Sequence, residues 1–130
     1  MTTLFRRVDP AKKFRITKGQ IARILGIAES IIVKFECWPF VLFVHRKDIG
    51  GQFVSYRVLE HWKNAIASQF QQCSTLQHLN HLWSTIKNDR KKHRKQYEDS
   101  VLSFLQKIWQ ECQDNLVEPL VYIQNDFTHH

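Results

Sequence analysis

The sequence predicts a mostly α-helical protein built, in order, from an N-terminal helix-turn-helix, a small β-hairpin and a long C-terminal helix. Three observations lead to this prediction. Apolar residues recur in steps of three and four within residues 17–36. Two glycines lie between β-forming segments at residues 47–51. The helical spacing then returns between Leu79 and Leu116.

These signals divide the chain into four segments. Residues 1–13 are expected to be a basic, poorly ordered arm, because Asp9 and Pro10 are typical of a turn. A short strand at residues 14–16 should lead into the first helix. The expected segments after the arm are a helix-turn-helix and hairpin domain at 14–72, a helical region at 73–118 and a C-terminal tail at 119–130.

The first predicted helix covers about residues 17–25. Thr17 is a favourable N-cap, because its hydroxyl can accept a hydrogen bond from a backbone N–H of the first turn. Ile21 and Leu25 lie four residues apart and therefore share one face. Gly26 follows where a left-handed cap is needed, and glycine has no Cβ to oppose that conformation.

A second helix is predicted at about residues 28–37. Ile32 and Phe35 repeat the helical spacing, and the pair Trp38-Pro39 should end the helix, because proline disfavours helical geometry in the preceding residue. In a helix-turn-helix, this second helix is the one that enters the major groove of DNA.

A hairpin and a third helix should follow. Residues 40–46 and 52–55 are rich in β-formers, and residues 47–51 between them carry Asp48 and two glycines. The third helix is expected at about 57–72. Its apolar face consists of Leu59, Trp62, Ile66 and Phe70.

A long helix should begin at a cap on Ser74 or Thr75, reach about Glu118 and stop at Pro119. A helix with so many apolar residues must pack on a second helix. We expect that helix to come from another copy of the chain, in a homodimer. The alternative is a helical hairpin within one chain, broken near Asn88-Asp89. The residues predicted to form the dimer contact are Trp83, Tyr97, Val101, Phe104, Leu105, Ile108, Trp109 and Cys112.

Positive charge is concentrated in the N-terminal half. Residues 1–57 contain eleven Lys or Arg and four Asp or Glu, whereas residues 58–130 contain eight of each. The net charge of +7 therefore falls entirely on the half with the predicted helix-turn-helix. Such a bias is expected of a surface that contacts nucleic-acid phosphates, although small basic domains are also common without that role.

Three short segments resemble the MerR family of transcription regulators. Residues 17–22 are similar to the opening of its DNA-binding domain, and Phe35-Glu36 to the aromatic-Glu pair that closes its recognition helix. Residues 50–56 resemble the wing, where a hairpin glycine precedes two aromatic residues and a helix. The resemblance covers about residues 14–70 and implies a winged helix-turn-helix. The sequence departs from the family at Val33, Lys34 and Val54.

The resemblance implies a sequence-specific regulator that binds double-stranded DNA, as a homodimeric repressor at a promoter operator. Little sequence follows the long helix, so neither an effector domain nor a small-molecule effector is expected. Small MerR-like repressors of this kind accompany mobile elements, including CRISPR-associated transposons. Two alternatives remain: an excisionase-like architectural DNA-binding protein, and a protein-interaction module that binds no DNA.

Polar and basic residues on the predicted helices and wing are the candidate DNA contacts. Lys34 could reach a guanine edge or a phosphate, Val33 a thymine methyl, and Arg46 a phosphate beside the wing. The complete set is Thr17, Lys18, Gln20, Glu29, Ser30, Val33, Lys34, His45, Arg46, Lys47 and Arg57.

Several other classes of function are not favoured. The longest apolar run, residues 38–44, is too short to span a bilayer, and no N-terminal signal pattern is present, so we expect a cytoplasmic protein without membrane contact. No catalytic signature occurs, so we expect neither an enzyme nor a cofactor.

The cysteines and histidines are the candidate metal ligands of this sequence. Cys37, Cys73 and Cys112 are odd in number and widely spaced, which favours reduced thiols over a disulfide framework. His78 and His81 could share a metal with a cysteine, but no paired-cysteine spacing supports a metal site, and none is expected.

Overall fold

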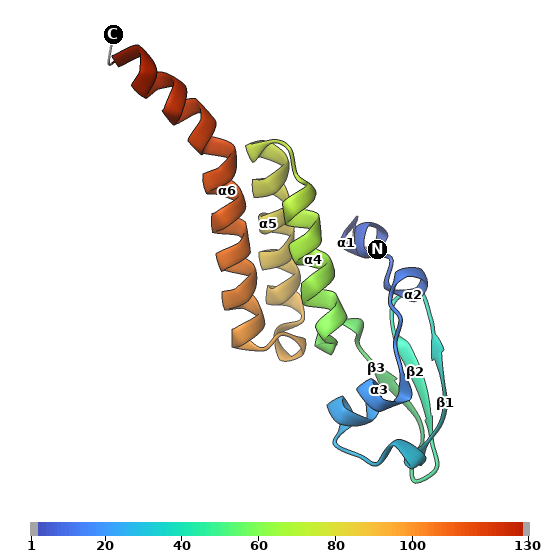
Figure 1. Cartoon of the computed structure of the whole chain (residues 1–130). Helices are drawn as coiled ribbons and strands as arrows, with labels where there is room; N and C mark the ends of the chain where they lie inside the picture. Colours follow the sequence, from blue (N-terminus) through green and yellow to red (C-terminus); the bar gives the residue numbers. More distant parts are fainter. Residues whose placement is uncertain (1–2, 129–130) are drawn as a thin grey trace. The chain divides into compact units, whose positions relative to one another are not determined.

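The computed structural model describes the backbone of residues 3–128 and the side chains of residues 4–117. The chain divides into two compact units, Met1–Asn64 and Ala65–His130. The first unit holds a small antiparallel sheet with short helices, and the second is helical (Figure 1). No helix in the described part of the chain combines the length and apolarity needed to cross a bilayer.

Residues 3–8 and 10–13 are helical, so the prediction of a poorly ordered arm was wrong. They form α1 (Thr3–Val8) and α2 (Pro10–Lys13). Leu4, Phe5 and Val8 are buried in the core of the first unit. Their spacing puts three apolar side chains on one side of a short helix, and their burial stabilises a segment that propensity alone would leave unfolded.

Helix α3 (Lys18–Leu25) forms where the first helix was predicted. The Thr17 hydroxyl accepts from the Gln20 backbone N–H at 3.2 Å, and the Gln20 side-chain oxygen accepts from the Thr17 N–H at 2.9 Å. This reciprocal capping box satisfies two N–H groups at the start of the helix. Gly26 ends α3 with φ of 67°. Residues 14–16 belong to neither helix nor strand, so the short strand predicted there was wrong.

The second helix of the predicted helix-turn-helix is absent from residues 28–37. A single turn of 3-10 helix, η1 (Glu29–Ile31), is followed by strand β1 (Ile32–Cys37). Residues 31–33 are three successive β-branched residues, which lose side-chain freedom in a helix and suit a strand. Pairing with a neighbouring strand therefore prevails over the helical spacing of Ile32 and Phe35.

The predicted hairpin is present as β2 (Leu42–Arg46) and β3 (Gly50–Val54), and Gly50 adopts φ of 84° in the turn. With β1 it forms a three-stranded antiparallel sheet in the order β1-β2-β3. Leu42, Val44 and Val54 are buried on one face. The register puts the alternate residues on the opposite face. This outer face carries Lys34, Glu36, Phe43, His45 and Phe53.

The third predicted helix begins later than expected, after a turn of 3-10 helix. These elements are η2 (Tyr56–Val58) and α4 (Glu60–Gln72). The Tyr56 hydroxyl donates to the Trp38 carbonyl at 2.6 Å. Burial raises the pKa of this hydroxyl above its usual value, so it keeps its proton and remains a donor.

Arg57 is part of the core of the first unit. Its side chain is only 8% exposed, and its guanidinium lies 4.8 Å from the centre of the Phe5 ring and 5.5 Å from that of Trp62. A guanidinium over an aromatic face is attracted by the partial negative charge on the face of the neutral ring. Arg57 therefore joins α1 to the start of α4.

The second unit contains the rest of α4 and a helical hairpin. The predicted continuous helix at 73–118 was wrong, and the alternative of a hairpin within one chain is present. Its break lies at residues 93–98, whereas the predicted position near Asn88-Asp89 falls inside a helix. Its helices are α5 (Leu76–Lys92) and α6 (Asp99–Thr128), and η3 (Arg94–Gln96) lies between them. The buried Tyr97 hydroxyl donates to the buried Asp89 carboxylate across the reversal.

Helices α5 and α6 contact each other through apolar side chains of the same chain. Leu105 is fully buried. The Trp109 ring stacks on Trp83 with centroids 5.5 Å apart, and its indole N–H donates to the Asn80 side-chain oxygen at 3.1 Å. The predicted Thr75 cap is confirmed, since its hydroxyl accepts from the His78 N–H.

The C-terminal end of α6 also differs from the prediction. The helix continues through Pro119 to Thr128, so the stop expected at Pro119 was wrong.

Replacing Leu105 by alanine should destabilise the second unit. The buried side chain lies between helices of the same chain, so its loss leaves a cavity that lowers the free energy of unfolding by about 2–5 kcal/mol. Urea unfolding followed by circular dichroism measures the change, with the exposed neighbour Gln106→Ala as the control. Unchanged stability together with a dissociated dimer would instead support the interchain helix packing.

Replacing Arg57 by alanine should destabilise the first unit by about 1–3 kcal/mol, because packing on two rings is lost together with the charge. The exposed Lys47→Ala variant should remain within about 0.5 kcal/mol of the wild type. Thermal unfolding compares the two. Equal stability of both variants would contradict the structural role of Arg57.

Candidate nucleic-acid interface

The first unit carries a dense run of exposed basic residues between positions 6 and 23. All seven Lys and Arg in this stretch are exposed, and Asp9 is the only acidic residue among them. No ion pair joins any of the seven to a residue whose side chain the structure describes. We call these residues the basic segment: Arg6, Arg7, Lys12, Lys13, Arg15, Lys18 and Arg23.

Buried apolar neighbours orient these cations. On α1, burial of Leu4, Phe5 and Val8 leaves Arg6 and Arg7 exposed to solvent. Because the helix is anchored by its own apolar side, the two guanidinium groups project from a defined surface.

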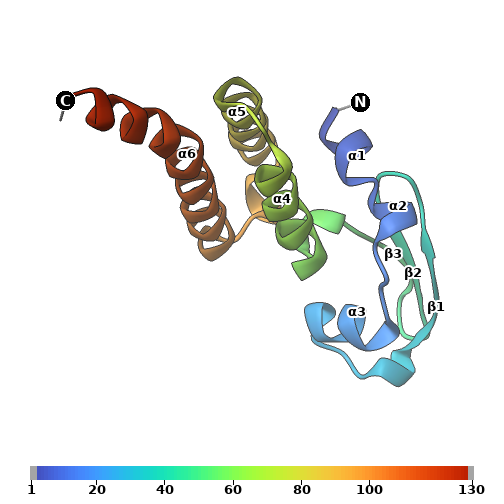
Figure 2. The ribbon, with the colours of Figure 1, turned by 45° about the horizontal axis from the view of Figure 1, so that its top comes forward.

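The same arrangement recurs on α3. Burial of Ile21 and Ala22, together with contact between α3 and β1, leaves Lys18 and Arg23 exposed. The extended residues 14–17 run from α2 to α3 alongside the strands (Figure 2), and they carry Arg15. The basic segment therefore follows a continuous path over folded elements of one unit.

The residues that were predicted to read bases do not lie on a recognition helix in the structure. Glu29 and Ser30 lie on η1, and Val33 and Lys34 lie on β1, so the predicted insertion of a helix carrying these four residues was wrong. All four side chains are exposed. The register puts Lys34 on the outer face of the sheet, opposite His45.

Thr17 and Gln20, which were predicted to contact DNA, form the capping box of α3 instead. Thr17 and Gln20 direct their side-chain oxygens to backbone N–H groups of the helix start, as described above. Lys18, between them, is exposed and remains available to an anion.

Acidic partners neutralise much of the predicted wing. The Arg46 guanidinium donates to both carboxylate oxygens of Asp48, at 2.9 and 2.6 Å, and to the Gln52 side-chain oxygen at 2.7 Å. The hydrogen bond from Arg46 lowers the pKa of Asp48, which keeps this carboxylate ionised. Lys47 in the turn is exposed. Arg57, also predicted as a phosphate contact, is buried between rings instead.

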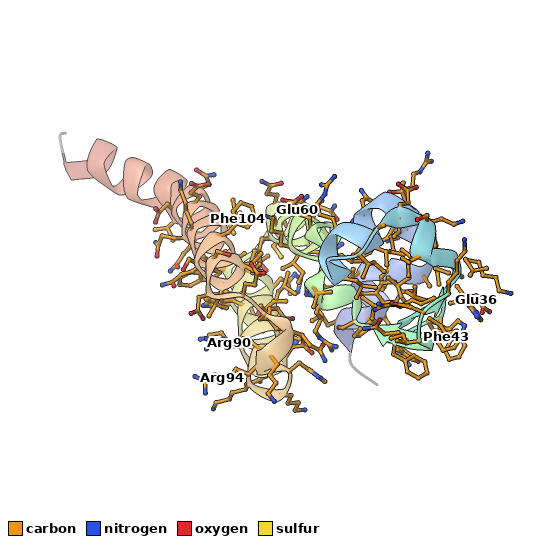
Figure 3. The ribbon with its side chains drawn as sticks, turned by 90° about the horizontal axis from the view of Figure 1, so that it is seen from below. Glu36, Phe43, Glu60, Arg90, Arg94 and Phe104 are labelled. Carbon is orange, nitrogen blue, oxygen red and sulfur yellow. The ribbon has the colours of Figure 1, made fainter. Side chains whose placement is uncertain are left out.

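His45 has a carboxylate partner of its own. Its Nε2 lies 2.6 Å from a carboxylate oxygen of Glu36 on the neighbouring strand. This hydrogen bond lowers the pKa of Glu36, so a negative charge persists on the outer face. Figure 3 shows Glu36 and Phe43 on this side of the sheet.

The second unit has a separate basic cluster around the reversal between α5 and α6. Arg90 lies 3.6 Å from Asp99, and the Lys87 ammonium lies 5.6 Å from the centre of the Trp83 ring. Cations in the last turn of a helix are stabilised by its dipole, which accounts for this position without a ligand. We call these residues the turn cluster: Lys87, Arg90, Lys91, Lys92, Arg94 and Lys95. Figure 3 labels Arg90 and Arg94 of this cluster.

The residues predicted for the dimer contact lie in the hairpin of the second unit. Trp83, Tyr97 and Leu105 are buried there. The remaining members are partly buried: Val101, Phe104, Ile108, Trp109 and Cys112. Burial raises the pKa of the Cys112 thiol. Within residues 4–117, no three His, Cys, Asp or Glu side chains gather as a metal site would require.

Sequence reasoning missed most of the basic segment as a site, because residues 1–13 were treated as a poorly ordered arm. The signal that could have found it is the combination of apolar residues at positions 4, 5 and 8 with arginines at 6 and 7. That spacing predicts a one-sided helix with cations on its exposed side.

Comparisons with protein-family models, curated proteins and solved structures found no match to this chain.

Proposed function

We propose that this protein binds DNA through its first unit and that the basic segment supplies the main phosphate contacts. The observation that carries the proposal is the exposure of seven cations within eighteen residues, with no ion pair to any described side chain. Exposed cations held on folded elements fit a ligand with regularly repeated negative charges, and duplex DNA is such a ligand.

The division of charge between the units supports the same assignment. Residues 1–64 contain twelve Lys or Arg and five Asp or Glu, which leaves +7, whereas residues 65–130 contain seven of each. The turn cluster is thus offset by acidic residues elsewhere in its unit. The field that attracts DNA therefore originates mainly in the first unit.

We further propose that the protein is a cytoplasmic transcription regulator that represses by occupying DNA. The capped helix α3 and the hairpin support this role, since both lie in the segments that resemble MerR regulators. Base reading would fall to the exposed side of α3 rather than to residues 28–37, and Lys18 and Arg23 are its basic residues.

An architectural DNA-binding role is the second candidate. It is favoured by the strand at residues 32–37, because a protein without a recognition helix there depends more on backbone contacts and on DNA shape. Footprints distinguish the two roles: a regulator protects one operator, and an architectural protein protects several sites in a region that it bends.

Binding to a labelled 20-base-pair duplex should weaken steeply with salt. If the basic segment engages most of its seven cations, log affinity against log salt should have a slope between about −3 and −6, at roughly −0.9 for each phosphate. Fluorescence anisotropy across a salt series measures the slope. A slope shallower than about −2 would count against a DNA-binding surface.

The triple variant Lys12→Ala, Lys13→Ala and Arg15→Ala should make this slope shallower by about 2.7, because three phosphate contacts are lost. The matched control removes three charges from the turn cluster: Lys91→Ala, Lys92→Ala and Lys95→Ala. It should change the slope by less than one contact, roughly 0.9. Equal effects of the two triple variants would show that net charge, and not the basic segment, governs binding.

A further inference from the structure

Among the side chains that the structure describes, the large apolar ones that are exposed lie in the first unit. Among residues 4–117, every such side chain lies between positions 24 and 58, whereas the helical hairpin of the second unit has none. Two of them, Trp38 at 40% exposure and Phe53 at 60%, gather around Phe43. An exposed apolar group of this kind marks an interaction surface more often than a structural need.

The three rings form a continuous surface, which we call the aromatic platform. Trp38 lies nearly parallel to Phe43, with an interplanar angle of 17° and centroids 5.0 Å apart. Phe53 completes the group, at 5.2 Å from Phe43 and 5.5 Å from Trp38. The three residues come from β2, β3 and the segment that follows β1.

Gly51 allows the platform to lie close to the sheet. A Cβ at this position would come within 2.4 Å of the Phe43 ring. Any other residue would therefore push the ring away from β3 and out of contact with its neighbours. Because Gly51 has no side chain, the Phe43 ring can lie directly on the backbone of β3, in contact with Trp38 and Phe53.

Charge identifies the occupant of this face. Lys34 and Glu36 are the charged residues of the outer face, and they cancel each other. A nucleic acid would bring phosphates against the Glu36 carboxylate, which its hydrogen bond with His45 keeps ionised. A neutral face with both signs on one strand is instead complementary to itself. In a two-fold pairing, Lys34 of each copy can lie near Glu36 of the other.

We propose that the outer face of the sheet binds a second copy of this chain, so that two sheets pack face to face through their aromatic platforms. Such packing would bury Trp38 and Phe53, which the single chain leaves exposed. It also provides a dimer contact while Leu105 and Trp109 pack inside the helical hairpin. The pairing itself does not depend on the proposed DNA binding.

Sedimentation of the full chain without DNA tests the proposal. The wild type should show a concentration-dependent equilibrium between monomer and dimer. Phe53→Asp should weaken the dimer by at least about 100-fold, because it buries a charge that has no partner. Phe53 is 60% exposed in the single chain, so the variant should keep its fold, which circular dichroism checks. Ile24→Asp, at an exposed residue of α3, is the matched control and should dimerise normally.

Charge exchange tests the two-fold pairing separately. Lys34→Glu and Glu36→Lys should each weaken the dimer, because each puts like charges opposite one another in the interface. Glu36→Lys also removes the intrachain partner of His45, so it is compared with Glu36→Gln, which loses that charge without adding a like one. The double variant restores opposite charges and should recover dimerisation. Failure of the double variant to recover, when both single variants are impaired, would overturn the pairing.

Three other results would overturn the proposal. These are a wild type that stays monomeric at every concentration, a dimer that survives Phe53→Asp, and a monomer in which single-stranded DNA shifts the indole N–H NMR signal of Trp38. The last result would make unpaired bases the occupant of the platform. The first two results are measured without DNA, so they do not bear on the salt-dependent binding of duplex DNA proposed for the basic segment.

Discussion

The pairing of residues 32–37 with β2 is the constraint on which the rest of the first unit depends. It turns a segment with helical apolar spacing into a strand, buries Ile32 under the sheet and completes an outer face that α3 does not cover. Because this segment is not a helix, no side chain within it can be carried into a groove in the manner of a recognition helix. Within the first unit, the exposed cations available to an anionic partner are then mainly those on α1, α2 and α3.

Features set by short-range chemistry could be predicted from the sequence. The Thr17 cap, the glycine end of α3, the hairpin turn at Gly50 and the Thr75 cap each depend on a few neighbouring residues. Features set by distant partners could not. Strand β1 needs β2 beside it. A hairpin was one of two alternatives, but the sequence did not place its reversal at residues 93–98, where Tyr97 bonds to the buried Asp89. Helical periodicity alone does not reveal such partners.

The candidate site, too, could be predicted only in part from the sequence. Counting charges located the positive excess in the N-terminal half, but it could not distinguish cations with acidic neighbours from those without them. Arg46 was predicted as a phosphate contact, yet Asp48 two residues away neutralises it. Arg57 was predicted for the same role, yet the rings of Phe5 and Trp62 enclose it. Both outcomes depend on side-chain geometry that residue type does not determine.

We propose that DNA contacts the basic segment and not the strand at residues 32–37. A titration of the isotope-labelled protein with duplex DNA, followed by amide NMR shifts, tests it most directly. If DNA binds the basic segment, the largest shift changes should fall within residues 6–23, and residues 32–37 should keep strand-like chemical shifts throughout. Large changes confined to residues 28–37, with helical shifts there and little response in residues 6–23, would contradict it.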